Sequence, residues 1–345
     1  MKIRKPAYFD NFRCLASACP DSCCKEWDVL VDEESAARYL SLEGTLGDAL
    51  RKVMYEEDGQ HYFAIQPDRR CPMWRGDGLC RIQAEAGEDA LCNTCRDFPR
   101  LTHDFGDFIE RQLELSCPEA AQIILSTPSA PWVTEEVPGG EAEYVEEAMT
   151  ALQTIREEAL AILDNRSYSP AQAMALLLIH GYRSQEVLDG GEEEPFDPVA
   201  ALELAADLAC QNDGADIGDF FLDLEILTPA WKQRLENGWQ PSEILDLCRP
   251  LARYFVERYY LQAVSDYDLV GRVKLAVVSC LLISNLGGDF IQTAQVYSKE
   301  IENDADNVDA ILDGAYSSPA LTDAKLLGLL LKYPTPPHLR GLKYC

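Results

Sequence analysis

The sequence predicts a mainly α-helical protein: a loop-rich cysteine-cluster N-terminal region with short strands, followed by an all-α helical domain. Three observations predict it. Nine of the 13 cysteines lie before residue 118. Apolar residues recur at helical spacing after residue 141. A stretch rich in Pro, Gly and Ser, residues 126–140, lies between the two parts and cannot sustain a helix. We therefore expect a cysteine-rich, metal-binding or iron–sulfur-binding domain at residues 1–125 and a helical domain at residues 141–345.

The second part reads as a series of helices. Residues 141–163 place Tyr144, Met149, Leu152 and Ile155 on helical spacing. Two Ser/Asp-Pro pairs are typical of helix starts, and they predict helices from Ser169 to about 188 and from Asp197 to about 210. Further helices are expected at 241–264, 268–286, 291–303 and 321–331. Residues 268–286 are apolar nearly all round, which predicts a central buried helix. Pro250 is expected to kink or break the 241–264 helix.

The first part has weaker signals of regular structure. Residues 27–32 and 61–66 alternate roughly between apolar and polar, which predicts two short strands. Residues 33–55, between them, look helical.

Composition limits the classes of function. With 47% apolar residues in 345, the chain can build a sizeable core. The formal net charge is -29, and no run of Lys or Arg exceeds a pair, which argues against a nucleic-acid binder. The charge favours a basic partner, or it simply keeps the protein in solution. The apolar run 275–283 is too short to span a membrane, and the N-terminus lacks an apolar signal segment, so we expect a cytoplasmic protein.

The early cysteines form four groups that indicate a metal centre. Disulfides rarely persist in a reducing compartment, where dense cysteine is more often metal-binding or catalytic. The Cys-x-x-Cys pair at 92 and 95 has a chelate spacing, because two thiolates on one tight loop can hold one ion. The candidate ligands are Cys14, Cys19, Cys23, Cys24, Cys71, Cys80, Cys92, Cys95 and Cys117. The widely spaced Cys210, Cys248, Cys280 and Cys345 look structural.

The number and kind of centres stay open at this point. A four-iron cluster or a structural zinc takes four protein ligands, so nine thiols imply two centres or some non-ligating thiols. Adjacent Cys23 and Cys24 point in different directions in an extended chain, which makes joint ligation of one ion awkward. His61 and His103 are the histidines of this part, so all-thiolate ligation by iron–sulfur or zinc is favoured, although His103 could replace one thiolate. A structural zinc or a thiol redox site are the alternatives.

Several catalytic motifs are absent from the sequence. It has no Cys-x-x-x-Cys-x-x-Cys run, since Glu26 stands where the third cysteine would follow Cys19 and Cys23. It also has no phosphate-binding P-loop, no G-x-S-x-G and no H-E-x-x-H, and no G-x-G-x-x-G follows a strand.

The cysteine motifs resemble those of the flagellin lysine N-methylases and, more distantly, bacterial cysteine-cluster proteins. The resemblance rests on residues 12–27, 71–72, 78–82, 91–100 (LCNTCRDFPR) and 115–119 (LSCPE), and it extends to 294–301 (AQVYSKEI) and 307–309. It implies transfer of a methyl group from S-adenosylmethionine to lysine side chains of flagellin, with the helical domain at 141–345 as the expected donor- and substrate-binding part. It also implies an iron–sulfur cluster, of the 4Fe-4S type, in the cysteine region, with zinc as the alternative.

Lysine methylation sets a chemical requirement. The acceptor amine must lose its proton, although the pKa of lysine is about 10.4 in water. Desolvation lowers that pKa, and aromatic faces hold ammonium and sulfonium groups. Residues 254–260 carry four aromatic rings and Glu257 on one expected helix, and core packing explains the same pattern. The sequence alone assigns no catalytic or donor-binding residue.

Overall fold

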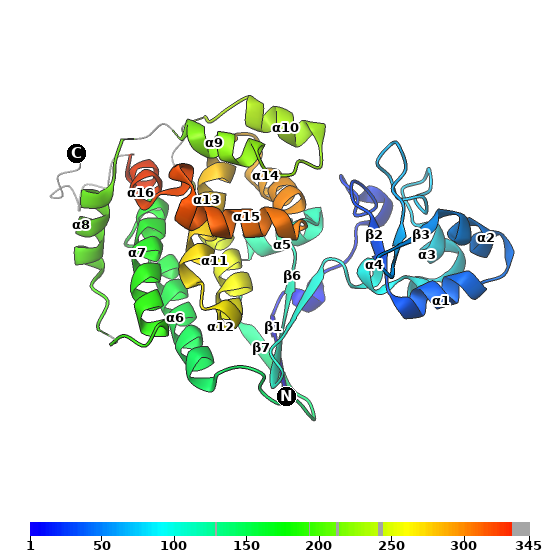
Figure 1. Ribbon diagram of the computed structural model, residues 1–345, viewed down its shortest axis with the longest axis horizontal. Coiled ribbons are helices and arrows are strands. Elements are labelled where there is room, and N and C mark those ends of the chain that lie inside the picture. Colours follow the sequence, from blue (N-terminus) through cyan, green and yellow to red (C-terminus); the bar gives the residue numbers. More distant parts are fainter. Residues whose placement is uncertain (128–129, 193, 212–213, 241–243, 333–345) are drawn as a thin grey trace.

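Two lobes of unequal size make up the computed structural model, which describes residues 1–127, 130–192, 194–211, 214–240 and 244–332 (Figure 1). Buried apolar residues form two clusters. One cluster lies within residues 29–92, and the other runs from Tyr8, Phe9 and Phe12 to Phe108 and on to Leu330. We call residues 14–98 the cysteine lobe and residues 1–13 with 99–332 the helical lobe. The predicted fold class, mainly α with short strands in a cysteine-rich first part, is confirmed.

The cysteine lobe has a small antiparallel sheet covered by short helices. Its strands are β2 (Val29–Val31), β3 (Met54–Glu57) and β4 (Gln60–Phe63), in the order β2-β4-β3. Its α-helices are α1 (Glu33–Ser41), α2 (Gly44–Val53), α3 (Arg81–Ala86) and α4 (Asn93–Asp97). Both predicted strands are present. The single helix expected at 33–55 is two helices, because Leu42 and Glu43 are extended and Gly44 takes a φ of +84°.

A second sheet, which the sequence pattern did not predict, joins the cysteine lobe to the helices. Its strands are β1 (Lys2–Pro6), β5 (Arg100–Asp104), β6 (Phe108–Leu113) and β7 (Trp132–Glu136), in the order β5-β6-β1-β7. Strand β1 runs parallel to β6 and antiparallel to β7. Strand β7 lies inside the stretch expected to be a linker, where pairing with the first residues of the chain supplies its hydrogen bonds. Residues 128–129 of that stretch lie outside the described residues.

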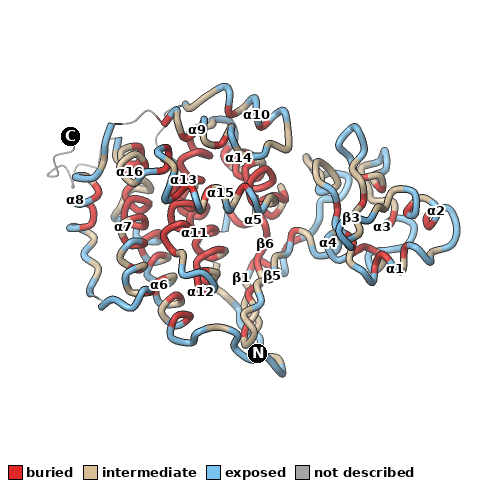
Figure 2. The backbone as a smooth tube through the Cα atoms, viewed as in Figure 1, coloured by how far each residue is buried: buried red, intermediate tan, exposed pale blue. Residues whose placement is uncertain are grey.

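The helical lobe packs around one fully buried helix. All residues of α13 (Leu269–Asn285) are buried, as predicted, and α7, α11 and α15 pack against it (Figure 2). The helices of this lobe are α5 (Pro118–Ser126), α6 (Glu146–Asp164), α7 (Pro170–Leu188), α8 (Pro198–Leu208), α9 (Ala215–Leu222), α10 (Pro229–Glu236), α11 (Cys248–Tyr259), α12 (Ala263–Asp266), α13, α14 (Phe290–Tyr297), α15 (Ala305–Ser317) and α16 (Asp323–Leu331).

Local chemistry explains where several of these helices begin. Ser169 and Gln172 form a reciprocal capping box at the start of α7, and Asp197 caps α8. The expected kink at Pro250 is absent. Helix α11 begins at Cys248, so Pro250 falls in the first turn, where a missing N–H breaks no intrahelical hydrogen bond. The predicted start of this helix at residues 241–243 lies outside the described residues, as does the chain after residue 332.

Within the described ranges, none of the helices combines the length and the apolar character needed to cross a membrane.

Candidate functional site

Eight of the nine candidate cysteines line one cavity of about 420 Å³. The ninth, Cys92, is fully buried in the core of the cysteine lobe and its thiol hydrogen-bonds with that of Cys95. Residues 116–119 of the helical lobe complete the wall. The cysteines that line the cavity are Cys14, Cys19, Cys23, Cys24, Cys71, Cys80, Cys95 and Cys117, and all are free thiols. The sequence groups, up to 103 positions apart, therefore converge on a single cavity.

Electrostatic contacts divide the nine thiols into two sets. The thiol of Cys23 interacts with Cys14 and Cys117, and Cys117 interacts with Cys19. We call Cys14, Cys19, Cys23 and Cys117 the first thiol group. The thiols of Cys71 and Cys80 interact with those of Cys24 and Cys92, and Cys95 interacts with Cys92, Cys24 and Cys71. We call Cys24, Cys71, Cys80, Cys92 and Cys95 the second thiol group. Adjacent Cys23 and Cys24 thus belong to different groups, and their thiols hydrogen-bond to each other.

Helix starts and backbone donors position three of the thiols. Cys80, Cys92 and Cys117 are the N-cap residues of α3, α4 and α5. The N–H groups of Ile82 and Gln83 donate to the Cys80 sulfur, and the N–H groups of residues 119 and 120 donate to that of Cys117. Such donors favour the thiolate form of cysteine. A cysteine directly before a short helix is the sequence signal that could have indicated this arrangement.

The thiols form two hydrogen-bonded pairs, and within each pair the two pKa values shift in opposite directions. The hydrogen bond from Cys23 lowers the pKa of the Cys24 thiol to about 7, against the effect of burial and with help from Ser22 and Lys299. The same bond raises the pKa of Cys23. The hydrogen bond with Cys95 likewise lowers the pKa of Cys92 and raises that of Cys95. Because the thiolate is the nucleophile and the metal ligand, Cys24 and Cys92 are the members of each pair poised to react or to bind.

Burial favours the neutral thiol form of Cys19, Cys71, Cys80 and Cys117. Desolvation raises the pKa of Cys71 to about 12 and that of Cys117 to about 11. A bound cation reverses this preference, because a coordinating thiol is deprotonated by the metal.

The donor set fits a thiolate metal centre by chemistry, although no closed ligand set is formed. In the part of the chain that the structure describes, no three Cys, His, Asp or Glu side chains converge in a way that could hold a metal ion. The thiols are free, share one cavity and receive backbone hydrogen bonds, which is the donor chemistry of iron–sulfur and zinc–thiolate sites. The metal-ligand role of the nine cysteines therefore stays a prediction.

Neither histidine of the first part lines the cavity. His61 lies on β4. His103 lies on β5, and its Nε2 is buried without a hydrogen-bond partner. Burial, and then the charge of Arg258, lower the pKa of His103 to about 4.

A short segment of the helical lobe contacts the chain on either side of Cys23 and Cys24. Residues 298–302 (η5, Ser298–Glu302) form a π-helical turn that continues α14, and such turns are frequent at functional sites. Lys299 on this turn forms ion pairs with Asp21 at 3.0 Å and with Glu26 at 2.6 Å. Two segments on which the family resemblance rests, 294–301 and the cysteine stretch 12–27, are therefore in direct contact.

The aromatic rings of residues 254–260 are packed in the hydrophobic core. Tyr254, Phe255, Tyr259 and Tyr260 are buried. The Glu257 carboxylate accepts hydrogen bonds from Arg253 at 3.0 Å and from the Trp132 indole at 3.2 Å, so it is already committed.

A buried charge network lies behind this segment. The Glu302 carboxylate accepts hydrogen bonds from the hydroxyls of Tyr254 at 3.1 Å and Tyr259 at 2.9 Å, and it pairs with Arg258 at 3.0 Å. The side chain of Glu302 is fully buried. Glu114 lies close to this network, and burial raises the pKa of its carboxyl group.

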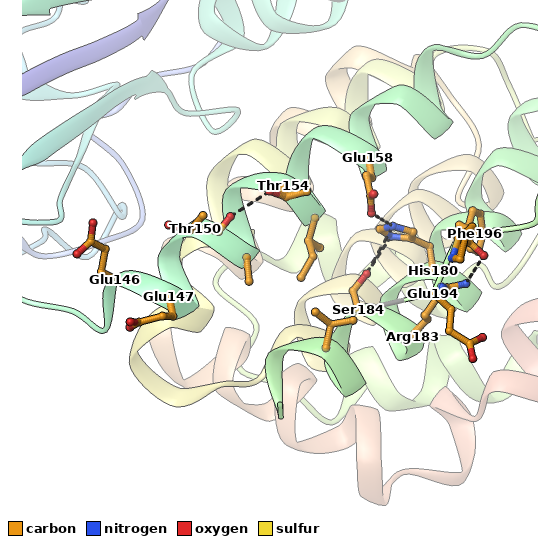
Figure 3. A pocket seen from close by; sticks show the side chains of 14 residues that line it. Glu146, Glu147, Thr150, Thr154, Glu158, His180, Arg183, Ser184, Glu194 and Phe196 are labelled. Atoms are coloured by element: carbon orange, nitrogen blue, oxygen red, sulfur yellow. Dashed lines mark hydrogen bonds and ion pairs between the residues drawn. The ribbon is translucent and has the colours of Figure 1, made fainter. Parts of the chain in front are cut away.

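A second cavity, of about 700 Å³, lies between α6 and α7 and the segment at 194–196 (Figure 3). Inside it, buried His180 contacts Glu158 at 3.0 Å and the edge of Phe196. Burial lowers the pKa of His180, so its ring is neutral at pH 7 despite the nearby carboxylate. Glu146, Glu147 and Glu194 give the cavity an acidic lining. No cysteine lies in it, so it is separate from the thiol site.

The fold and the site together define a class: a helical protein that carries a cysteine lobe, with a thiol-lined cavity where the two lobes meet. Comparison with known proteins gives the family. The chain is 34% identical over 134 residues to the flagellar biosynthetic protein FliU of Salmonella muenchen, covering 37% of this chain and 79% of that protein. It is 32% identical over 140 residues to the lysine-N-methylases of Salmonella choleraesuis and Salmonella typhimurium, covering 39% of this chain. The chain belongs to this family of FliU and the lysine-N-methylases.

The shared region is partial for the larger relatives. The chain matches 35% of the length of each lysine-N-methylase, about a third. No family model matches the chain, and no solved structure matches it.

Proposed function

We propose that this protein is a methyltransferase that moves a methyl group from S-adenosylmethionine to lysine side chains of flagellin, in the cytoplasm. Its membership in a family whose relatives are named lysine-N-methylase and flagellar biosynthetic protein is the observation that carries the proposal. The thiol cavity supports it, because its volume lies within the range of cavities that hold small ligands.

The reaction needs a neutral amine beside a sulfonium. The lysine Nζ lone pair forms the new N–C bond, the S–C bond of the donor breaks with its electrons left on sulfur, and the amine loses one proton. Aromatic faces hold the lysine ammonium as it enters, before it loses its proton, and the sulfonium of the donor. Trp27 and Phe98 line the cavity in an edge-to-face pair with ring centroids 5.7 Å apart. Glu119, which also lines it, supplies negative charge that guides a lysine side chain inward.

The ligands of the iron–sulfur cluster that the family resemblance implies would come from among the nine early cysteines. A bound cluster would supply redox-active, Lewis-acidic iron at the wall of the cavity. The protein's own contribution is to bring thiols from both lobes together and to lower the pKa of Cys24 so that a thiolate is present near neutral pH.

A direct assay tests the proposal. Anaerobically purified, iron-loaded protein is incubated with methyl-labelled S-adenosylmethionine and flagellin, and the flagellin is mapped by mass spectrometry. We expect label on lysine residues. Unlabelled lysines with a fully loaded centre would refute methyl transfer. A matched reaction with the Cys24→Ser variant should show whether the thiol cavity is required.

The thiols also support a second candidate function. In it the protein is a non-enzymatic scaffold stabilised by a bound metal, or a redox module, and it binds a basic partner. The hydrogen-bonded pairs Cys23–Cys24 and Cys92–Cys95, with one thiol of each lowered in pKa, favour it. The net charge of -29 favours a basic partner. Colour separates the metals, because iron–sulfur clusters absorb visible light and a zinc scaffold is colourless. Binding of flagellin without methylation would identify the scaffold.

A further inference from the structure

Two side chains of the helical lobe, Gln295 of α14 and Lys299 of η5, make polar contacts with the cysteine lobe. The Gln295 amide donates across the lobes to Asp21 Oδ2 at 3.2 Å and, within the helical lobe, to the Ser116 carbonyl at 2.8 Å. The Lys299 ammonium donates to Asp21 Oδ2 at 3.0 Å, contacts Glu26 Oε2 at 2.6 Å and donates to the Ser22 carbonyl at 3.3 Å. We call Gln295 and Lys299 the interlobe latch.

The latch is buried, so its charges depend on their partners. The Lys299 side chain is 5% exposed, and its carboxylate partners are 25% and 20% exposed. Its ammonium also lies 6.0 Å from the centre of the Trp27 ring. A buried ammonium is costly unless it is paired and hydrogen-bonded, so losing the two carboxylates would leave Lys299 in an unfavourable state. Closure of the lobes supplies those partners.

The partners of the latch lie on both sides of the thiols in the chain. Asp21 and Ser22 directly precede Cys23, and Glu26 follows Cys24 by two residues. The chain otherwise passes between the lobes only at residues 12–14 and 98–99. Cys117, at the N-terminus of α5, belongs to the helical lobe, whereas Cys19 and Cys23 belong to the cysteine lobe. The first thiol group is therefore complete only when the lobes are closed.

We propose that Lys299, assisted by Gln295, is a positioning residue that holds the loop of Cys19–Cys24 against Cys117, so that the thiol cavity can retain a metal centre between the two lobes. The metal part of this inference rests on the proposed thiol centre. The closure of the lobes does not.

The experiment compares Lys299→Met with a matched buried lysine. Lys274 of α13 is equally buried, pairs with Asp323 at 3.0 Å and donates to the Ala315 and Leu321 carbonyls, with no thiol among its partners. Full-length wild type, K299M, K299R and K274M are compared by small-angle X-ray scattering of the metal-free form. Zn²⁺ affinity is then measured by competition with a chromophoric chelator. The doubly substituted Asp21→Asn, Glu26→Gln protein tests the same contacts from the other lobe.

We expect K299M to have a larger maximum dimension than wild type and Zn²⁺ affinity lower by about 10- to 100-fold, as for loss of groups that support metal ligands. K274M should match wild type in both, and K299R should recover part of each. If K299M does not fold, the Asp21/Glu26 variant decides. The inference is overturned if K299M, or that variant, matches K274M in dimension and Zn²⁺ affinity. A wild type that binds no metal, with K299M still expanded, would reject the thiol centre and keep the latch.

Discussion

Replacing Cys92 by Ser should lower both the metal content of the protein and its free energy of unfolding. Cys92 is fully buried, hydrogen-bonds with Cys95 and caps α4. Metal binding in small thiolate domains contributes about 10–16 kcal/mol across four ligands, hence about 3 kcal/mol per thiolate. That loss corresponds to roughly 150-fold in metal affinity. Without metal, burying a Ser hydroxyl in the same place costs about 1–2 kcal/mol.

Cys280 provides the matched control for this prediction. It is also fully buried, and its thiol is hydrogen-bonded to a second buried thiol, that of Cys248. Cys280→Ser should therefore lower stability by a similar amount in the metal-free form and leave metal content unchanged. The assay is urea unfolding with and without metal, together with metal analysis of each variant. The reasoning is refuted if the C92S protein retains as much metal as C280S.

Three further predictions concern the fold. Burial lowers the pKa of His103 to about 4, so below pH 6.5 the unfolded chain takes up a proton that the folded chain does not. The free energy of unfolding should therefore fall by up to about 3 kcal/mol as the pH drops from 6.5 to 4. His103→Gln should reduce this pH dependence, measured by urea unfolding. Glu302→Gln leaves the buried Arg258 uncompensated and should cost about 3–5 kcal/mol, whereas an unchanged melting temperature would show that the network is not strongly coupled. A Cβ on Gly181 would lie 2.6 Å from a Val273 methyl, so Gly181→Ala should destabilise by about 1–3 kcal/mol, while Gly218→Ala, with open space in α9, should stabilise by about 0.5–1 kcal/mol.

The sequence predicted the helices whose signals are local. Helix α13 is apolar nearly all round, and α7 begins with a Ser-Pro pair and a capping box between Ser169 and Gln172, so periodicity and capping sufficed for both. Pro250 was misjudged because its effect depends on where the helix begins, and the start at Cys248 places it in the first turn. Helix α15 was not predicted, although Asp304 caps it.

Pairing between distant segments could not be predicted in the same way. Strand β7 is mostly exposed and polar, and it is a strand because Lys2–Pro6 pairs with it. The convergence of the thiols was predicted from their number, but their division into two groups depends on Cys117 and on the folding of residues 19–24. The contact of Lys299 with Asp21 joins residues 278 positions apart, and no local pattern indicates it.

The central claim is that the early thiols hold inorganic iron. Its most direct test is the iron and acid-labile sulfide content, with the visible absorption spectrum, of the full-length protein purified without oxygen. We expect a brown protein with about four irons and four sulfides per chain, as for one 4Fe-4S cluster. A colourless protein that holds zinc, or no metal at all after anaerobic reconstitution with iron and sulfide, would contradict the claim.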